Sequence, residues 1–253
     1  MRAGTLVSTF GIGLALALTA QAAKAGTVTD INISPLLGDW TGEFGGSAIA
    51  AAPTNGNTGT GITFGDWSGH YGLTLSGAST ILSTGGITLN NDASVNALMN
   101  SFFGGPAGSV EATITFLNSN GGQATYSLIA GQTIRDYNNG GYNNVLQGYN
   151  SASGLGNVTT QPWWTTGDAA NNGNGEPSQR LDVQTFVLPS SWAGTGLISM
   201  TINNPISSGN DVAYSALQVV DGSASVPEPM SLALLGSALG TLALARRARR
   251  KAD

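Results

Sequence analysis

Residues 110–129 read VEATITFLNSNGGQATYSLI, and this stretch decides the fold class. Two β-type segments, Val110–Leu117 and Gln123–Ile129, flank the five residues Asn118-Ser119-Asn120-Gly121-Gly122. Asn and Gly tolerate the positive φ angles that tight turns require. The stretch therefore predicts a β-hairpin.

Outward from this hairpin, Gly- and Asn-rich turns separate further β-type segments. We expect strands at Thr27–Ile33, Gly61–Phe64, Tyr71–Ser76, Gly86–Leu89, Arg180–Leu188, Leu197–Ile202 and Val212–Val220. In the segment 180–188, Leu181 and Val183 share one face, whereas Phe186 and Leu188 share the other. Both faces are partly apolar, as in a strand of a sandwich. The sequence predicts an all-β jelly-roll or β-sandwich ectodomain.

One short helix is expected after Asp92, which is a suitable N-cap. Val95, Leu98, Met99, Phe102 and Phe103 follow at helical spacing and form one apolar stripe. Gly104 and Gly105 would end this helix. We expect it to pack over a sheet edge.

The composition restricts the function classes. Charged residues make up 9% of the 253, and there is no cysteine. Between Gly26 and Val226 the basic residues are Arg135 and Arg180, against twelve acidic ones, so this region carries 2 − 12 = −10 charges. Nucleic acid is an unsuitable partner, because neutralising phosphates requires clustered basic side chains. Cysteine nucleophiles and disulfides are excluded.

The first 25 residues have the features of a signal peptide. Arg2 precedes an apolar run from Leu6 to Ala20, and Ala23-Lys24-Ala25 gives the small-x-small pattern that signal peptidase cleaves before Gly26. A second cleavage site follows Ala22, and the alternative is an uncleaved membrane anchor. We expect an exported ectodomain over residues 26–225.

The last segment, residues 226–253, has three consecutive parts. Pro227-Glu228-Pro229 precedes an apolar run of 16 residues, Met230–Ala245. A basic cluster follows, with Arg246, Arg247, Arg249, Arg250 and Lys251. Sixteen helical residues span about 24 Å, which is somewhat less than the hydrocarbon core, and long basic side chains compensate for the difference. The basic cluster is expected to stay cytoplasmic.

This arrangement resembles the PEP-CTERM sorting domain of Gram-negative bacteria. The resemblance implies a transmembrane sorting helix that an exosortase recognises and cuts, after transient residence in the inner membrane. It also implies a final place at the cell surface or in an extracellular matrix, in bacteria that make exopolysaccharide. The alternative is an ordinary C-terminal anchor.

The distal half of the middle region, roughly Val110 to Val220, resembles galactose-binding-like sandwiches of exported bacterial proteins. The residues that carry this resemblance are Ile134-Arg135-Asp136-Tyr137, Phe186-Val187-Leu188-Pro189 with Trp192, and Ala213–Val219. Likeness of fold does not establish ligand binding.

An aromatic cluster is the candidate ligand site. Tyr137, Tyr142, Trp163 and Trp164 occur in one Asn- and Gly-rich stretch. Flat aromatic rings stack on sugar faces, and Asn side chains hydrogen-bond to hydroxyl groups. Adjacent tryptophans in a strand point to opposite faces, so we expect at most one of them to reach a glycan. The alternative role for the cluster is core packing.

Other sites receive weaker support. Asp168, Asn172, Asn174 and Glu176 lie in an oxygen-rich loop that suits a structural calcium ion, although the spacing is not that of an EF-hand. The alternative is a flexible polar loop, and no other cofactor is expected.

A glycan hydrolase needs two carboxylates beside a cleft. The glutamates of the middle region are Glu43, Glu111 and Glu176, and we expect Glu111 at an edge or facing solvent. The sequence therefore predicts, in order, a non-enzymatic surface or matrix protein, a module for neutral polysaccharide, and a hydrolase.

Overall fold

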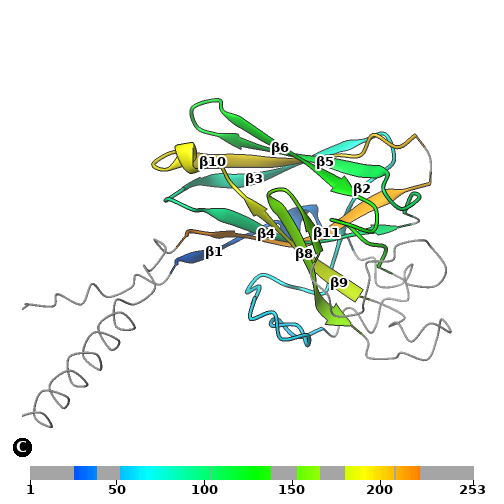
Figure 1. The fold of residues 1–253 in the computed structure, drawn as a ribbon. Helices are drawn as coiled ribbons and strands as arrows, with labels where there is room; N and C mark the ends of the chain where they lie inside the picture. Colours follow the sequence, from blue (N-terminus) through cyan, green and yellow to red (C-terminus); the bar gives the residue numbers. More distant parts are fainter. Residues whose placement is uncertain are drawn as a thin grey trace, which may run out of the picture.

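The structure is a computed structural model that describes residues 26–38, 52–102, 104–137, 153–165, 180–207 and 209–222. These residues form two β-sheets in which all strand pairings are antiparallel (Figure 1). The seven-stranded sheet has the order β1 (Val28–Ile31), β11 (Asp211–Val220), β4 (Ser94–Phe102), β9 (Arg180–Val187), β8 (Val158–Thr165) and β7 (Ser153–Leu155), and β2 (Gly72–Thr74) also pairs with β11. The four-stranded sheet has the order β3 (Ser79–Thr88), β10 (Gly196–Asn203), β5 (Val110–Asn118) and β6 (Gln123–Ile129).

The two sheets pack face to face, as in a β-sandwich, and the main core lies between them. The four-stranded sheet contributes Ile114, Phe116 and Met200, and the seven-stranded sheet contributes Val95 and Phe186. Phe116 and Phe186, from opposite sheets, meet edge to face with ring centroids 5.4 Å apart. The all-β prediction is confirmed for the described residues.

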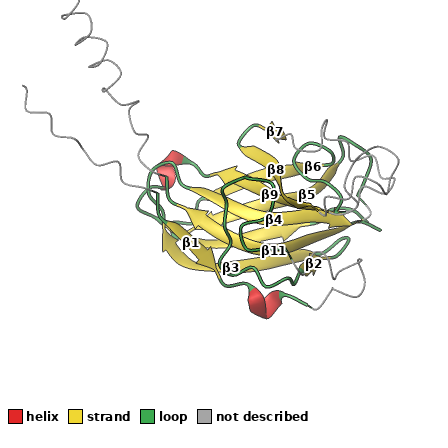
Figure 2. Cartoon of the chain, turned by 90° about the horizontal axis from the view of Figure 1, so that it is seen from below, coloured by secondary structure: helices red, strands yellow, loops and turns green. Residues whose placement is uncertain are grey.

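A second core covers the other face of the seven-stranded sheet. Residues 52–71, which contain no strand, cross this face, as the cyan loop below the sheet in Figure 1 and the loop in front of the strands in Figure 2 show. Phe64 and Trp67 of this loop pack with Trp163 of β8 and Leu98 of β4. The larger sheet is therefore buried on both faces.

The hairpin predicted from residues 110–129 is confirmed. β5 and β6 pair from Val110↔Ile129 to Leu117↔Gln123. The Asn118 side-chain oxygen accepts hydrogen bonds from the backbone of Asn120 and Gly122, and Gly121 has a φ of 79°. Turn chemistry is local, so it could be read directly from the sequence.

The prediction of a helix after Asp92 is wrong, because Ser94–Phe102 forms the strand β4. Val95 and Met99 face the core between the sheets, whereas Leu98 and Phe102 face the second core. A strand that is apolar on both sides produces helical spacing by coincidence. Asp92 has a φ of 58°, which suits a turn and not a helix N-cap.

Other expected elements differ in their bounds. Gly61–Phe64 lies in the covering loop and is not a strand, and β3 extends far upstream of the expected Gly86–Leu89. β7 and β8 had no predicted counterpart. The helical turns of the described chain are two short 3₁₀ segments, Ser34–Leu36 and Ser190–Trp192, red in Figure 2.

The beginning and the end of the sandwich are neighbours. β1 pairs with β11 from Val28↔Val220 to Ile31↔Leu217, and Asp221 N donates to Thr27 O over 2.9 Å. β1 therefore begins where β11 ends, at the left of Figure 1. The predicted signal peptide and the segment 226–253 lie outside the described residues. Within the described residues, no helix is long and apolar enough to cross a membrane.

Candidate functional site

In the larger sheet, β4 and β9 separate along part of their length, and a buried polar cluster lies at this split. β4 pairs with β9 only as far as Leu98↔Val183. Beyond this point the segment 133–137 lies between the two strands. On the β4 side, Ser101 N donates to Arg135 O over 2.9 Å and Tyr137 N donates to Ser101 O over 3.1 Å. On the β9 side, Arg180 N donates to Tyr137 O over 2.9 Å.

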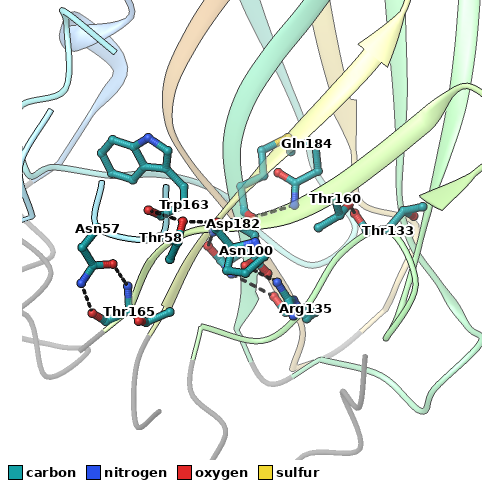
Figure 3. A network of polar contacts seen from close by, with 12 residues as sticks. Asn57, Thr58, Asn100, Thr133, Arg135, Thr160, Trp163, Thr165, Asp182 and Gln184 are labelled. Atoms are coloured by element: carbon teal, nitrogen blue, oxygen red, sulfur yellow. Dashed lines mark hydrogen bonds and ion pairs between the residues drawn. The ribbon is translucent and has the colours of Figure 1, made fainter. Parts of the chain in front are cut away.

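Polar side chains close the rest of the split (Figure 3). The Asn100 amide donates to Arg135 O over 3.3 Å, and its oxygen accepts from Asp182 N over 3.1 Å. The Arg135 guanidinium makes a two-pronged contact with the Asp182 carboxylate, Nε to Oδ2 and Nη2 to Oδ1, both 2.6 Å. Gln184 donates to Met99 O over 3.0 Å. These side chains satisfy backbone groups that a continuous sheet would pair.

This cluster holds both basic residues of the region between Gly26 and Val226. Arg135 and Arg180 are buried, as are Asp136 and Asp182. Buried charges are tolerated when they are paired and hydrogen-bonded. Because the Arg135–Asp182 pair is fully enclosed, its geometry serves the fold and offers no surface to a substrate.

Glu111 lies between the sheets at the end of the sandwich, next to this cluster. A β-bulge interrupts the β5–β6 register between Val110 and Ala112, and Glu111 is the inserted residue. The bulge turns its side chain inward, and the residue is completely buried. The expectation that Glu111 faces solvent is therefore wrong.

The surroundings of Glu111 disfavour its charged form. Burial raises the pKa of Glu111 to about 7, and the Asp136 carboxylate also raises it. The Ser101 hydroxyl and the Gly105 N–H, which are close by, act in the opposite direction. The Ser101 hydroxyl and the Glu111 carboxyl group are therefore each other's neighbours in this buried space, with the Gly105 N–H as the other donor.

The tryptophans of the predicted aromatic site lie in the second core. Trp163 has no exposed surface; its Nε1 donates to Ile62 O over 2.8 Å, and its ring meets Phe64 and Trp67 edge to face. Trp164 is 7% exposed. Side chains enclosed in this way present no flat face to a sugar, so their placement favours the core-packing alternative.

A second bulge explains why both tryptophans join the same cluster. The β8–β9 register shifts between Pro162 and Trp164, which breaks the alternation expected of adjacent strand residues. The covering loop attaches here, since the Thr58 hydroxyl donates to Trp163 O over 3.0 Å and Asn57 exchanges two hydrogen bonds with the Thr165 backbone (Figure 3).

Tyr137 is the one predicted tyrosine in the described chain, and it packs on Phe102 at 4.4 Å between ring centroids. Tyr142 lies outside the described residues, as do the candidate calcium ligands Asp168, Asn172, Asn174 and Glu176. The same holds for Ala23, Ala25, Pro227, Glu228, Pro229 and the arginines 246, 247, 249 and 250; Gly26 is the first described residue.

The outer face of the four-stranded sheet carries three rows of uncharged side chains, which we call the hydroxyl face. The strand register places them side by side. The rows are Ser79–Asn203–Thr113–Ser127, Ile81–Thr201–Thr115–Thr125 and Ser83–Ser199–Leu117–Gln123. Thr115 and Thr125 hydroxyls lie 3.2 Å apart, and Ile81 is 65% exposed. In a domain with net charge −10, these twelve positions carry no charge.

Sequence reasoning placed Glu111 on the wrong side of its strand and missed the hydroxyl face, for different reasons. The inward turn of Glu111 depends on a bulge, which residue order alone does not signal. The hydroxyl face was detectable in principle as Thr-Ile-Thr alternation at 113–115, yet its rows depend on pairings between distant strands. No protein-family model matches the chain, and no curated protein is similar to it.

Proposed function

We propose that the chain is an exported, non-enzymatic surface or extracellular-matrix protein of a Gram-negative bacterium. An exosortase would process its tail, and its final environment would be the exopolysaccharide. The observation that carries the proposal is the order of Pro227-Glu228-Pro229, an apolar run and an arginine cluster at the end of the chain. Within this proposal, the sandwich is of the jelly-roll, galactose-binding-like type that residues 110–220 resemble.

The arrangement of β1 and β11 supports this proposal. The signal-peptidase site precedes β1 directly, and the sorting motif follows β11 within a few residues. Because these two strands pair, both processing sites connect to the same end of the sandwich. A domain held at the membrane by this end would project the rest of its surface away from the bilayer.

Intact-mass analysis of the protein recovered from the cell surface or medium tests this proposal. We expect the mature chain to begin at or near Gly26 and to lack residues 246–251. A mature surface protein that retains the arginine cluster would contradict exosortase processing. Changing Arg246, Arg247, Arg249 and Arg250 to Ser should cause missorting, because these charges hold the tail cytoplasmic.

A second candidate function, binding of neutral polysaccharide, is favoured by the hydroxyl face. The face measures about 14 Å by 13 Å, from strand spacings of about 4.8 Å and rows about 6.7 Å apart. Hydroxyl and amide groups match sugar hydroxyls, and the exposed Ile81 side chain provides apolar contact. An acidic polymer would be repelled by the net charge of the domain, whereas a neutral one is not.

Substitution in the middle row tests this second function. Thr115→Asp and Thr201→Asp place a carboxylate in the centre of the face and should weaken retention on the host's neutral polysaccharide at least about tenfold, which corresponds to about 1.4 kcal/mol. The matched control is Thr159→Asp, at an exposed position of β8 in the other sheet. Equal retention of all three variants would exclude the hydroxyl face as the binding surface.

A further inference from the structure

We propose that the edge strand β3 pairs with β3 of a second copy of this chain, which joins two four-stranded sheets into one antiparallel sheet. The two-fold axis would pass between the Ile81 residues of the two copies, so that Ser79 of one copy lies opposite Ser83 of the other. The proposal does not depend on the proposed sorting or on glycan binding.

The two sheets differ in how their edges are protected. At the edges of the larger sheet lie β1, four residues that include Asp30, and β7, three residues. Short edge strands and charged side chains are common protections against pairing with another chain. By contrast, β3 is an edge strand of ten residues without a charged residue or a proline. The four-stranded sheet therefore presents a long edge that lacks these protections.

The register shows which backbone groups of β3 point toward this open edge. Asn204 N donates to Ala78 O over 2.9 Å, so this pair is hydrogen-bonded. Hydrogen-bonded and non-hydrogen-bonded pairs alternate along antiparallel strands. The pairs that β10 makes with Ser79, Ile81 and Ser83 are therefore of the second kind. The N–H and C=O groups of these three residues point away from β10, and no other described strand pairs with β3.

The side chains along this edge are self-complementary. Ser79, Ile81 and Ser83 lie on the hydroxyl face, with a serine two positions before the isoleucine and another two positions after it. A two-fold axis at Ile81 therefore sets isoleucine against isoleucine and serine against serine. Because closed two-fold dimers are the commonest soluble homo-oligomers, this symmetry favours a second copy of the chain as the partner.

Ile81 provides the apolar contact between the two copies. It is 65% exposed, the largest fraction among the exposed large hydrophobic side chains of the described chain. Cross-strand pairs of β-branched side chains stabilise antiparallel sheets. No Asp, Glu, Lys or Arg lies between Asp66 and Asp92, or between Asp182 and Asp211. Pairing along β3, with β10 behind it, therefore brings no like charges together, although the domain is strongly negative.

The proposed pairing has two consequences for the assembly. An axis perpendicular to the sheet keeps both hydroxyl faces on the same side, so the dimer would present one face of twice the width. Pairing through a single strand is a small interface, and small interfaces are typical of weak, transient association. We therefore expect a dimer whose fraction depends strongly on protein concentration.

Disulfide trapping tests the register, because the chain has no cysteine of its own. Full-length Ser79→Cys and Ser83→Cys chains, with tags of different size, are mixed in mild detergent and oxidised at several concentrations. We expect a mixed disulfide whose yield rises with concentration and is several-fold above the yield from either chain alone. Two Ser79 positions would lie about 13 Å apart along the strands, beyond the reach of a disulfide.

Further substitutions in both reporter chains test the contact itself. Ile81→Lys places like charges opposite each other and should reduce the mixed disulfide to background, and Ile81→Ala should lower it several-fold. Thr125→Lys, at an exposed position of the other edge strand β6, is the matched control and should leave the yield unchanged. Three results would overturn the proposal: no mixed disulfide above background, a yield that persists in Ile81→Lys, or a yield lost in Thr125→Lys. The last result would assign the partner edge to β6.

Discussion

At the scale of single residues, Glu111 shows how a bulge changes the chemistry of a side chain. By strict alternation it would share the exposed face of Thr113 and Thr115, but the inserted residue turns into the interior. Burial raises its pKa from 4.5 to about 7. A folded state that holds this proton more tightly than the unfolded chain gains stability at low pH, and it loses this gain as the pH rises through about 7.

The wild type should therefore lose stability between about pH 4.5 and pH 8. Glu111→Gln removes the ionisation and should be more stable than the wild type at pH 8 by as much as about 3 kcal/mol, at 1.36 kcal/mol per pH unit. Urea unfolding of both proteins across this pH range measures the difference. Parallel pH profiles of the two proteins would contradict it.

For Trp163, the predicted role and the observed placement differ most: it was a candidate glycan-binding residue, and it lies in the second core. Its indole fills the centre of the second core, and we expect Trp163→Ala to lower the free energy of unfolding by about 3–5 kcal/mol. Trp163→Phe keeps an aromatic ring and should cost clearly less. Chemical unfolding measures these free energies. If Trp163→Ala were as stable as the wild type, Trp163 would not be a core residue, and a binding role at the surface would again be the better interpretation.

At the scale of elements, the enclosed Arg135–Asp182 ion pair helps to hold the split between β4 and β9. Removing either partner leaves a buried charge alone, so Arg135→Met or Asp182→Leu should each cost about 3–5 kcal/mol. The double variant should recover much of this loss, because an apolar pair needs no compensation. A double-mutant cycle by urea unfolding measures the coupling, and simply additive losses would show that the pair does not act as a unit.

The covering loop depends on a close approach at Gly56. Its φ is 64°, and a Cβ there would lie 2.0 Å from Trp163 O, a contact that backbone atoms cannot relieve. Gly59 has a similar φ of 77° but open space around it. Both alanine variants bear the left-handed strain of about 1–2 kcal/mol. Only Gly56→Ala should also detach the loop, which a larger fall in melting temperature would show.

Elements differed in how well the sequence predicted them. The β5–β6 hairpin depends on adjacent residues, and it formed as expected. β4 failed because its two apolar faces, one toward each core, imitate the spacing of an amphipathic helix. β8 carried no clear signal, since Pro162 and the bulge before Trp164 interrupt its alternation. The second core could not be predicted either, because the loop that covers it, residues 52–71, has no strand periodicity.

At the scale of the whole molecule, the predictions for the two end segments come from the sequence, whereas the arrangement of the middle region comes from the structure. The predicted targeting signals are linear, so they could be identified without the fold. The polar cluster beside β4 and the hydroxyl face are assembled from segments far apart in the chain, so the sequence contained their residues but did not reveal their proximity. The pairing of β1 with β11 brings together the two strands that lie next to the proposed processing sites.

This pairing sets a limit on where the N-terminus can be cut. The two predicted signal-peptidase sites, after Ala22 and after Ala25, both leave β1 intact, so chains that start at either site should melt at the same temperature. A chain that starts at Asn32 loses the four pairings of β1 and the buried side chain of Ile31. We expect this loss to cost about 2–4 kcal/mol, from the apolar surface exposed and the strand hydrogen bonds broken. Melting curves of the three chains, all ending at Gly222, measure the effect. If the shortest chain were as stable as the others, β1 would be dispensable, and the fold would not couple the two proposed processing sites.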